Sequence, residues 1–313
     1  MRTLILNSNN IIPNTNNSIL QYQFPGGNIN LVKGQKVALA SLQMYYSTFN
    51  ITSANKNNQF NYIWVDGTSH SVVFPDGFYD AVSINNFLHF TMVQNKHYLV
   101  DTTGDYVYFI TFSINASRYA IEVNCFNMSA ALAVANGWSL PAGATWVIPT
   151  NSIVPMLQIL ANNFQYVVGY TAGYYPQGKS GNYAQAVIAG APPNQTQTPS
   201  YTTTQTFLGD LVPQITPLSS YILTCSLINN NYAVPNNLLY SFSPQGTFGE
   251  QFTIQPSGNL SFIDVLPGQY NRFTMSFIDQ NFNPVSILDP NYVIMLLITD
   301  PDEHSTSNII RKM

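Results

Sequence analysis

Two stretches near the C-terminus decide how this chain folds: Arg272-Phe-Thr-Met-Ser-Phe-Ile278 and Tyr292-Val-Ile-Met-Leu-Leu-Ile298. The first alternates apolar and polar side chains, which is typical of a β-strand with one face in a core. The second is a continuous apolar run of a strand's length, too short to span a membrane. The turn-forming segment Asp279-Gln-Asn-Phe-Asn-Pro284 follows the first. Both stretches therefore predict strands of a β-sheet.

Working outward from these stretches, further strand patterns lie at both ends of the chain, separated by turns rich in Pro, Gly and Asn. They cover Lys36–Tyr46, Gln59–Val65, Ser220–Leu227, Leu238–Phe242, Phe252–Ile254 and Leu260–Ile263. Two strands at the start and about six at the end predict an all-β fold. We expect a single jelly roll of two antiparallel sheets with an inserted β-rich subdomain that contains one or two short helices.

The expected organisation has three parts. Residues 1–66 are an N-terminal arm and the first jelly-roll strands, residues 67–204 the insertion, and residues 205–313 the remaining strands and a polar tail. The Asn-rich residues 1–30 are expected to order only against a neighbouring subunit.

The insertion has local signals of its own. Asp80 is a candidate N-cap of a helix on which Val82, Asn86 and Phe90 stack. The segments expected after this helix are a hairpin of Tyr106–Phe112 and Tyr119–Cys125, a helix within 128–140 that ends at Asn136-Gly137, a strand at Tyr166–Tyr170 and a long loop over Gly173–Thr206.

Charge is scarce in this chain. Only 8% of its 313 residues are charged, against about a quarter in ordinary soluble proteins. Between Lys179 and Glu250 there is one carboxylate, Asp210, and no cation, whereas the whole chain holds 20 Tyr and 19 Phe. A surface with so little charge is expected to be covered by other subunits, which favours an assembly protein over an enzyme in free solution.

The net charge of −4 excludes a strong field for nucleic acid or anionic membranes, and the only clustered bases are Arg311 and Lys312. The four histidines lack the spacing of a metal site, and no nucleophile elbow or phosphate loop occurs. Asp76 and Asp80 lie in a turn, where turn and cap roles are expected. We therefore expect no catalytic residue, cofactor or metal. Cys125 and Cys225 are expected as buried thiols rather than a disulfide, and no secretory signal is visible, which favours an intracellular product.

Several short motifs, taken in order, resemble one family. They are Gly77-Phe78-Tyr79, Val167-Val-Gly-Tyr170, Ser220-Tyr-Ile-Leu-Thr-Cys-Ser226 and Phe273-Thr-Met-Ser-Phe-Ile-Asp279. This order resembles the penton (minor capsid) proteins of virophages and of related Polinton-like elements. The resemblance implies a structural protein whose homopentamers close the five-fold vertices of an icosahedral virion.

The same resemblance implies the partners and the location. The partners would be other copies of the chain, the major capsid protein and further minor capsid proteins. The protein would be made in the host cytoplasm and reside in the virion capsid. Candidate interface residues are the aromatic side chains of the least charged stretch, which provide large contact areas. They are Tyr170, Tyr174, Tyr175, Tyr183, Tyr201 and Phe207. The alternative for each is packing within the inserted region of its own subunit.

Two other structural roles remain open at this point. A jelly roll also serves as a carbohydrate- or receptor-binding module, in which exposed Trp138 and Trp146 could stack on sugar rings, while Trp64 is expected in a strand core. A coat or spike subunit is the second, although a double jelly-roll coat would need a longer chain. Stoichiometry separates these roles: a pentamer for a penton, a trimer for a coat or fibre, and a monomer or dimer for a lectin.

Overall fold

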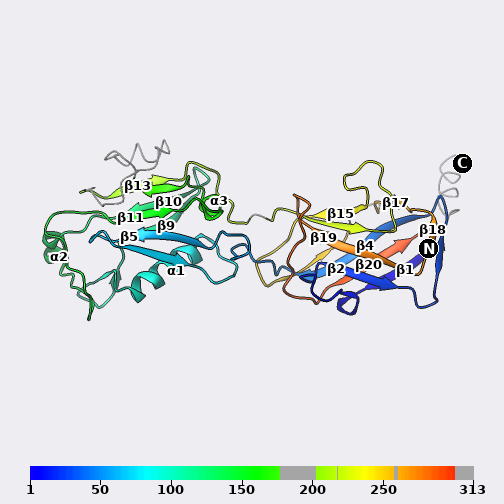
Figure 1. Cartoon of the computed structure of the whole chain (residues 1–313), viewed down its shortest axis with the longest axis horizontal. Coiled ribbons are helices and arrows are strands. Elements are labelled where there is room, and N and C mark those ends of the chain that lie inside the picture. The colour runs from blue at the N-terminus through cyan, green and yellow to red at the C-terminus, as the bar shows by residue number, and fades with distance from the viewer. Residues whose placement is uncertain (177–201, 217, 257–259, 300–313) are drawn as a thin grey trace, which may run out of the picture. The chain divides into compact units, whose positions relative to one another are not determined.

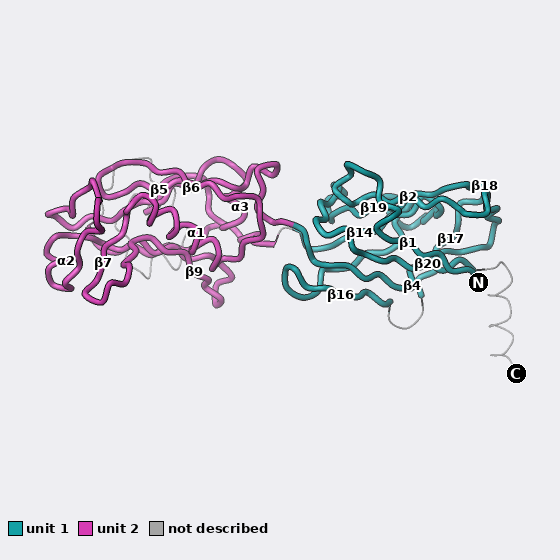
Figure 2. The backbone as a smooth tube through the Cα atoms, turned by 90° about the horizontal axis from the view of Figure 1, so that it is seen from below, with its two compact units in different colours: residues 1–48, 218–313 teal, residues 49–217 magenta. Residues whose placement is uncertain are grey.

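The computed structural model describes residues 1–176, 202–216, 218–256 and 260–299, which form mostly antiparallel β-sheets (Figure 1). The chain divides into two compact units (Figure 2). Unit 1 comprises residues 1–48 and 218–313, and unit 2 comprises residues 49–217. Unit 2 is thus inserted into the chain of unit 1.

Among its described residues, unit 1 contains two antiparallel sheets and a small additional ribbon. The first sheet has the order β1 (Arg2–Leu6), β20 (Val293–Ile298), β4 (Lys36–Tyr45) and β16 (Gln251–Ile254), with β17 (Ile263–Asp264) also paired to β4. The second has the order β15 (Leu238–Phe242), β14 (Tyr221–Cys225), β19 (Arg272–Ile278) and β2 (Ile19–Gln23). The ribbon pairs β3 (Ile29–Leu31) with β18 (Gly268–Tyr270).

The strand order in these two sheets is that of a jelly roll. Along the chain the main strands run β1, β2, β4, β14, β15, β16, β19 and β20. β1 pairs with β20, β2 pairs with β19, and β4 lies between β20 and β16. Two interleaved four-stranded layers of this kind define the fold, and the insertion falls between β4 and β14. The predicted jelly roll with an insertion is confirmed.

The N-terminal segment belongs to the core of unit 1, which corrects the expectation that residues 1–30 form an arm. β1 pairs with β20 along its whole length, and β2 pairs with β19. Leu6 and Leu20 are fully buried. The short apolar runs in this segment are ordered by strands that follow them in the chain by more than 200 residues, and no neighbouring subunit is needed for that pairing.

The described part of unit 2 contains two main sheets, three helices and a ribbon. Its sheets have the orders β12 (Gly173–Tyr175), β11 (Met156–Ile159), β5 (Gln59–Ile63), β6 (Ser69–Val73), and β13 (Gln205–Leu208), β10 (Ala120–Cys125), β9 (Ile110–Asn115). The remaining elements are α1 (Ala81–Gln94), α2 (Ala130–Asn136), α3 (Phe164–Val168) and the β7 (Leu99–Val100) and β8 (Tyr106–Val107) ribbon. In unit 1, Ser8–Asn10 form a 3-10 turn.

Unit 2 extends beyond the expected insertion limits of 67 and 204. The strand β5 was expected in the jelly roll, but it pairs with β6 and β11 of unit 2. Phe60 and Tyr62 of β5, together with Trp64 directly after it, are fully buried in the core of that unit. A strand pattern shows that a segment pairs with a sheet, but it does not show which sheet.

The first two helices follow their local signals. The Asp80 side chain accepts a hydrogen bond from Ser83 N at the start of α1, and α2 ends at Gly137 in the left-handed conformation. The face of α1 that enters the core is formed by Ala81, Ile84, Leu88 and Met92. Val82 and Phe90 are exposed instead.

Two expected features of unit 2 differ from the structure. Tyr166–Tyr170 was expected as a strand, but Phe164–Val168 form α3, because Asn162 Oδ1 accepts a hydrogen bond from Phe164 N and Gly169 ends the turn. The expected loop over Gly173–Thr206 begins with β12 and ends at β13, and residues 177–201 lie outside the described part of the chain. No helix among the described residues is long and apolar enough to cross a membrane.

Candidate functional site

The acidic residues that the sequence singled out stabilise turns. Asp80 caps α1, and hydrogen bonds from Ser83 hold the pKa of this carboxyl below its usual value. Asp76 accepts hydrogen bonds from the backbone N–H and the hydroxyl of Ser53. The expected turn and cap roles are therefore confirmed for both carboxylates.

The histidines of unit 2 pack against aromatic rings. His89 stacks on Tyr108 with ring centroids 3.8 Å apart, and its Nε2 lies 3.1 Å from the Ile110 carbonyl oxygen. His89 lies on α1 and is partly buried. His97 is buried, with its ring stacked on Trp64 and 4.4 Å from the ring of His70. Burial lowers the pKa of all three imidazoles.

Cys125 and Cys225 are buried free thiols, as predicted, and burial raises the pKa of each. Among the described residues, no three His, Cys, Asp or Glu side chains lie close enough together to hold a metal ion. The buried thiols are protonated at neutral pH and are not placed for chemistry.

The candidate interface residues fall into three groups. Tyr170, Tyr175 and Phe207 are buried in the core of unit 2, where the Tyr170 hydroxyl donates to the carbonyl oxygens of Ile121 and Phe207. Tyr174 is half-buried, and its hydroxyl accepts from Gln158 Nε2. Tyr183 and Tyr201 lie outside the described residues. For the three buried side chains, the alternative of packing within their own subunit holds.

The tryptophans also belong to the core of unit 2. Trp64 is fully buried, as expected, and Trp146 is 5% exposed, with its Nε1 donating to the Lys96 carbonyl oxygen. Trp138 packs edge-on against Phe109. The suggestion that Trp146 is exposed for stacking on a sugar was wrong, because its ring fills the space beside Trp64.

A charge-free surface lies on the outside of the first jelly-roll sheet. In the β1, β20 and β4 register, Ile5 is opposite Met295, which is opposite Ser41, and Val293 is opposite Gln43. Ile5 is 51% exposed and Val293 40% exposed. We call this surface the β20 face. It consists of Thr3, Ile5, Ser41, Gln43, Val293, Met295 and Leu297, none of which carries a charge.

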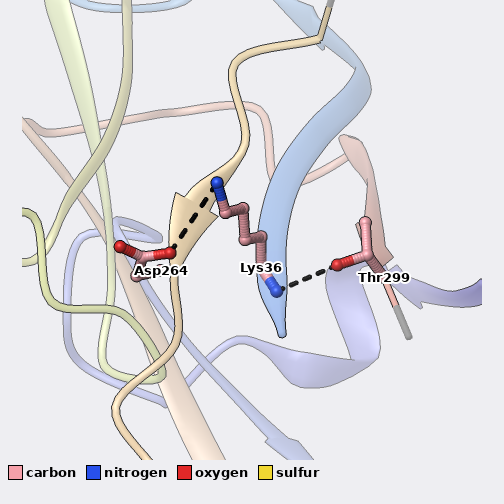
Figure 3. Close-up of polar contacts among 3 residues, drawn as sticks. All are labelled: Lys36, Asp264 and Thr299. Carbon is pink, nitrogen blue, oxygen red and sulfur yellow. Dashed lines mark hydrogen bonds and ion pairs between the residues drawn. The ribbon is translucent and has the colours of Figure 1, made fainter. Parts of the chain in front are cut away.

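A charged pair, Lys36 and Asp264, lies at one end of this sheet (Figure 3). Lys36 Nζ lies 3.9 Å from Asp264 Oδ1, and both side chains are open to solvent, so this pair contributes little to stability. The Lys36 backbone N–H donates to the Thr299 hydroxyl at 3.0 Å, and Thr299 N donates back to the Lys36 carbonyl oxygen. These bonds fix the last described residue of the chain against the start of β4.

The β20 face was not among the sequence-based candidates. The signal was available, because Val293, Met295 and Leu297 alternate with the buried Ile294, Leu296 and Ile298 along β20. An apolar run predicts a strand that is buried on both faces. Only the side-chain exposure in the folded subunit, with Ile5 and Val293 open to solvent and Ile294 buried, shows that one face of this strand is uncovered.

Comparisons with known proteins give the following findings. No family model matches the chain, and no curated protein matches it. Among solved structures, the chain is similar to the mavirus penton protein, with 10% identity, a TM-score of 0.41, and coverage of 95% of this chain and 96% of that one. It is also similar to a chain of the Sputnik virophage structure, with 12% identity, a TM-score of 0.40, and coverage of 97% and 98%. With TM-scores below 0.5, these similarities do not assign a function.

Proposed function

We propose that this protein is a structural capsid protein whose homopentamers close the five-fold vertices of an icosahedral virion. The observation that carries the proposal is the β20 face, an apolar and uncharged sheet surface on a jelly roll. The resemblance of the sequence motifs to virophage penton proteins supports the same role. No chemistry is required of the protein in this role.

The β20 face has the properties of a surface that is covered in an assembly. Exposed Ile5 and Val293 lie beside the half-buried Met295 and Leu297, and the polar members of the face are Thr, Ser and Gln. Apolar cores with neutral hydrogen-bonding rims are typical of subunit interfaces, and removing such side chains from water costs less than removing charges. A ring of identical subunits needs two different contact patches on each copy, of which the β20 face is one.

The partners follow from this role. In the virion, the pentamer would contact the major capsid protein around each vertex and further minor capsid proteins. The protein would be made in the host cytoplasm before assembly.

The mass of the purified full-length protein tests the proposal directly. Five chains of 34.8 kDa give about 174 kDa for a closed ring. We expect this mass by multi-angle light scattering, and five-fold class averages in negative-stain micrographs. A stable trimer would overturn the vertex role in favour of a coat or fibre subunit. A monomer at all concentrations, both alone and with the major capsid protein, would overturn it in favour of a binding module.

A substitution on the β20 face tests the location of the contact. Ile5→Lys places a charge where half of the native side chain is exposed, so the isolated subunit should tolerate it, and edge strands commonly carry Lys. The same charge buried between subunits should prevent ring formation. Val134→Lys is the matched control, since Val134 is 83% exposed on α2. Equal pentamer yields for both variants would show that the β20 face is not a contact.

A further inference from the structure

A polar cleft in unit 2 is not used by the proposed assembly role. Its volume is about 410 Å3, and it is lined by Asn55, Lys56, Asn57, Asn163, Tyr166 and Gln214. These residues come from three separate segments of the chain: the loop before β5, the start of α3, and the segment after β13.

Backbone hydrogen bonds hold these three segments together. Asn163 N donates to the Lys56 carbonyl oxygen at 3.1 Å, and Asn163 Nδ2 donates to the Asn55 carbonyl oxygen at 2.7 Å. Gln214 N donates to the Tyr166 carbonyl oxygen at 2.8 Å. Close packing fixes the third segment further, because a Cβ at Gly169 would lie 2.5 Å from the Leu211 carbonyl oxygen. The cleft is therefore a defined structure rather than a gap between loose loops.

The chemistry of the cleft is unusual for this chain. Lys56 is exposed and is the only cation between Lys36 and Lys96. Within the described residues, no carboxylate lies within ion-pair distance of its ammonium. The side-chain amides of Asn55 and Gln214 make no hydrogen bond to described protein groups. The Lys56 ammonium and the two side-chain amides of Asn55 and Gln214 thus line the same small volume without a hydrogen bond to described protein groups.

An aromatic ring completes the lining. Tyr166 is 47% exposed although it belongs to a helix whose other large side chains are buried. An exposed tyrosine ring beside uncharged amides suits the flat apolar side of a sugar ring together with its hydroxyl groups. The single ammonium adds a preference for one negative charge, which a carboxylate on the sugar would supply through a charge-assisted hydrogen bond.

We propose that this cleft binds a carboxylated saccharide, with Tyr166 stacked on the sugar ring, Lys56 on the carboxylate, and the amides of Asn55 and Gln214 on hydroxyl groups. This function is additional to the assembly role and does not depend on pentamer formation. A nucleic acid does not fit the cleft, because phosphate backbones are bound by several cations and this site has one. A purely apolar ligand would leave the Lys56 ammonium and the amides of Asn55 and Gln214 without hydrogen-bond partners.

Ligand-observed NMR on the full chain tests the proposal with defined probes. The carboxylated probes are 3′-sialyllactose and a hyaluronan tetrasaccharide, and lactose is the neutral probe. We expect saturation transfer to at least one carboxylated probe in the millimolar affinity range, and at least about tenfold weaker binding of lactose.

Four variants locate the binding. Lys56→Gln should weaken binding about tenfold, Lys56→Arg should retain it, and Tyr166→Ala should abolish the stacking contribution. Lys96→Gln is the matched control: Lys96 shares the left-handed backbone conformation of Lys56, with φ of 59° against 52°. Lys96 Nζ bonds to Gly143, outside the cleft. Thermal unfolding of each variant confirms that unit 2 is folded.

Each result bears on the proposal. Binding of a carboxylated probe that is lost in folded Lys56→Gln and Tyr166→Ala and kept in Lys96→Gln supports it. Absence of binding at ten millimolar probe overturns it, as does equal binding of lactose or equal loss in the Lys96→Gln control. Competition by inorganic phosphate at the same concentration as sialyllactose would show an anion site without sugar recognition, and would also overturn it.

Discussion

Acidification should destabilise unit 2 through one buried imidazole, that of His97. The Tyr62 hydroxyl accepts a hydrogen bond from Asn95 Nδ2, which can only donate, and it lies 2.8 Å from His97 Nδ1. With Asn95 as a donor, the hydroxyl keeps its own proton to donate to Nδ1 of the neutral imidazole, which then acts as the acceptor. Protonation of the imidazole would reverse this hydrogen bond and place a positive charge in the core, beside Trp64 and His70.

The magnitude follows from the pKa of His97. Burial, the largest cause, together with nearby His70, lowers the pKa of His97 from 6.5 to about 4, while Asp66 opposes this change. The unfolded chain thus binds more protons than the folded chain between these two values. The stabilising contribution is complete above the unfolded pKa and is lost as the pH falls toward the folded pKa. The full shift corresponds to about 3 kcal/mol. Because the neighbouring His70 is partly open to solvent, water screens the charge on His97, and we expect a loss of about 1–2 kcal/mol.

Tryptophan fluorescence measures this effect selectively, because Trp64, Trp138 and Trp146 are the three tryptophans of the chain and all belong to unit 2. Urea unfolding at about pH 7 and about pH 4.5 should show the loss of free energy. His97→Gln keeps an acceptor for Tyr62 and removes the titration, so its free energy of unfolding should change much less between these pH values.

The His89→Gln variant is the control. His89 is partly buried, and its bond to the Ile110 carbonyl oxygen favours the charged form and offsets part of the burial effect. This variant should therefore keep most of the pH dependence. The reasoning is refuted if the wild type and His97→Gln lose the same free energy on acidification, or if unit 2 becomes more stable at low pH.

Other expected outcomes follow from the core contacts. Leu6→Ala should destabilise unit 1 by about 2–4 kcal/mol because Leu6 is fully buried. Ile5→Ala, at an exposed position, should cost much less. Equal thermal unfolding midpoints for the two variants would show that residues 1–30 are an arm outside the core. Tyr170→Phe should lower the stability of unit 2 by about 1–2 kcal/mol, since two buried carbonyl oxygens lose a donor. The pentamer yield per amount of folded protein should not change. Asp80→Ala should cost about 1 kcal/mol in urea unfolding through loss of the α1 cap. Cys125 should react with a thiol reagent only after denaturation; reaction in the native protein would contradict its burial.

Local signals in the sequence were sufficient for the elements that depend on neighbouring residues. The helix α1 begins after Asp80, and α2 ends at Gly137. The strand β10 lies within the predicted Tyr119–Cys125 segment, and β15 and β19 have the predicted bounds. The hairpin partner β9 is shifted to Ile110–Asn115 from the predicted Tyr106–Phe112, the start of which forms β8. Caps, tight turns and side-chain alternation are set by steric and hydrogen-bonding preferences over a few residues, so they can be predicted from the sequence alone.

Competing local preferences explain the helix that the sequence analysis missed. Tyr166, Val167 and Val168 are β-branched or aromatic, which favours a strand. In the structure the amide oxygen of Asn162 starts the turn and Gly169 ends it. Packing of Phe164, Val167 and Val168 into the core of unit 2 outweighs the strand preference.

The sequence by itself determined the all-β character, the jelly-roll strand spacing, the absence of charge over long stretches and the caps of two helices. Only the tertiary structure decided that β1 closes the first sheet, that β5 belongs to unit 2 and that Tyr170, Tyr175 and Phe207 are core residues. It also decided which face of β20 is open, and that Lys56, Asn163 and Gln214 share one cleft. The physical reason is that these features arise from pairing between segments far apart in the chain, whose complementarity is expressed only when both are in place.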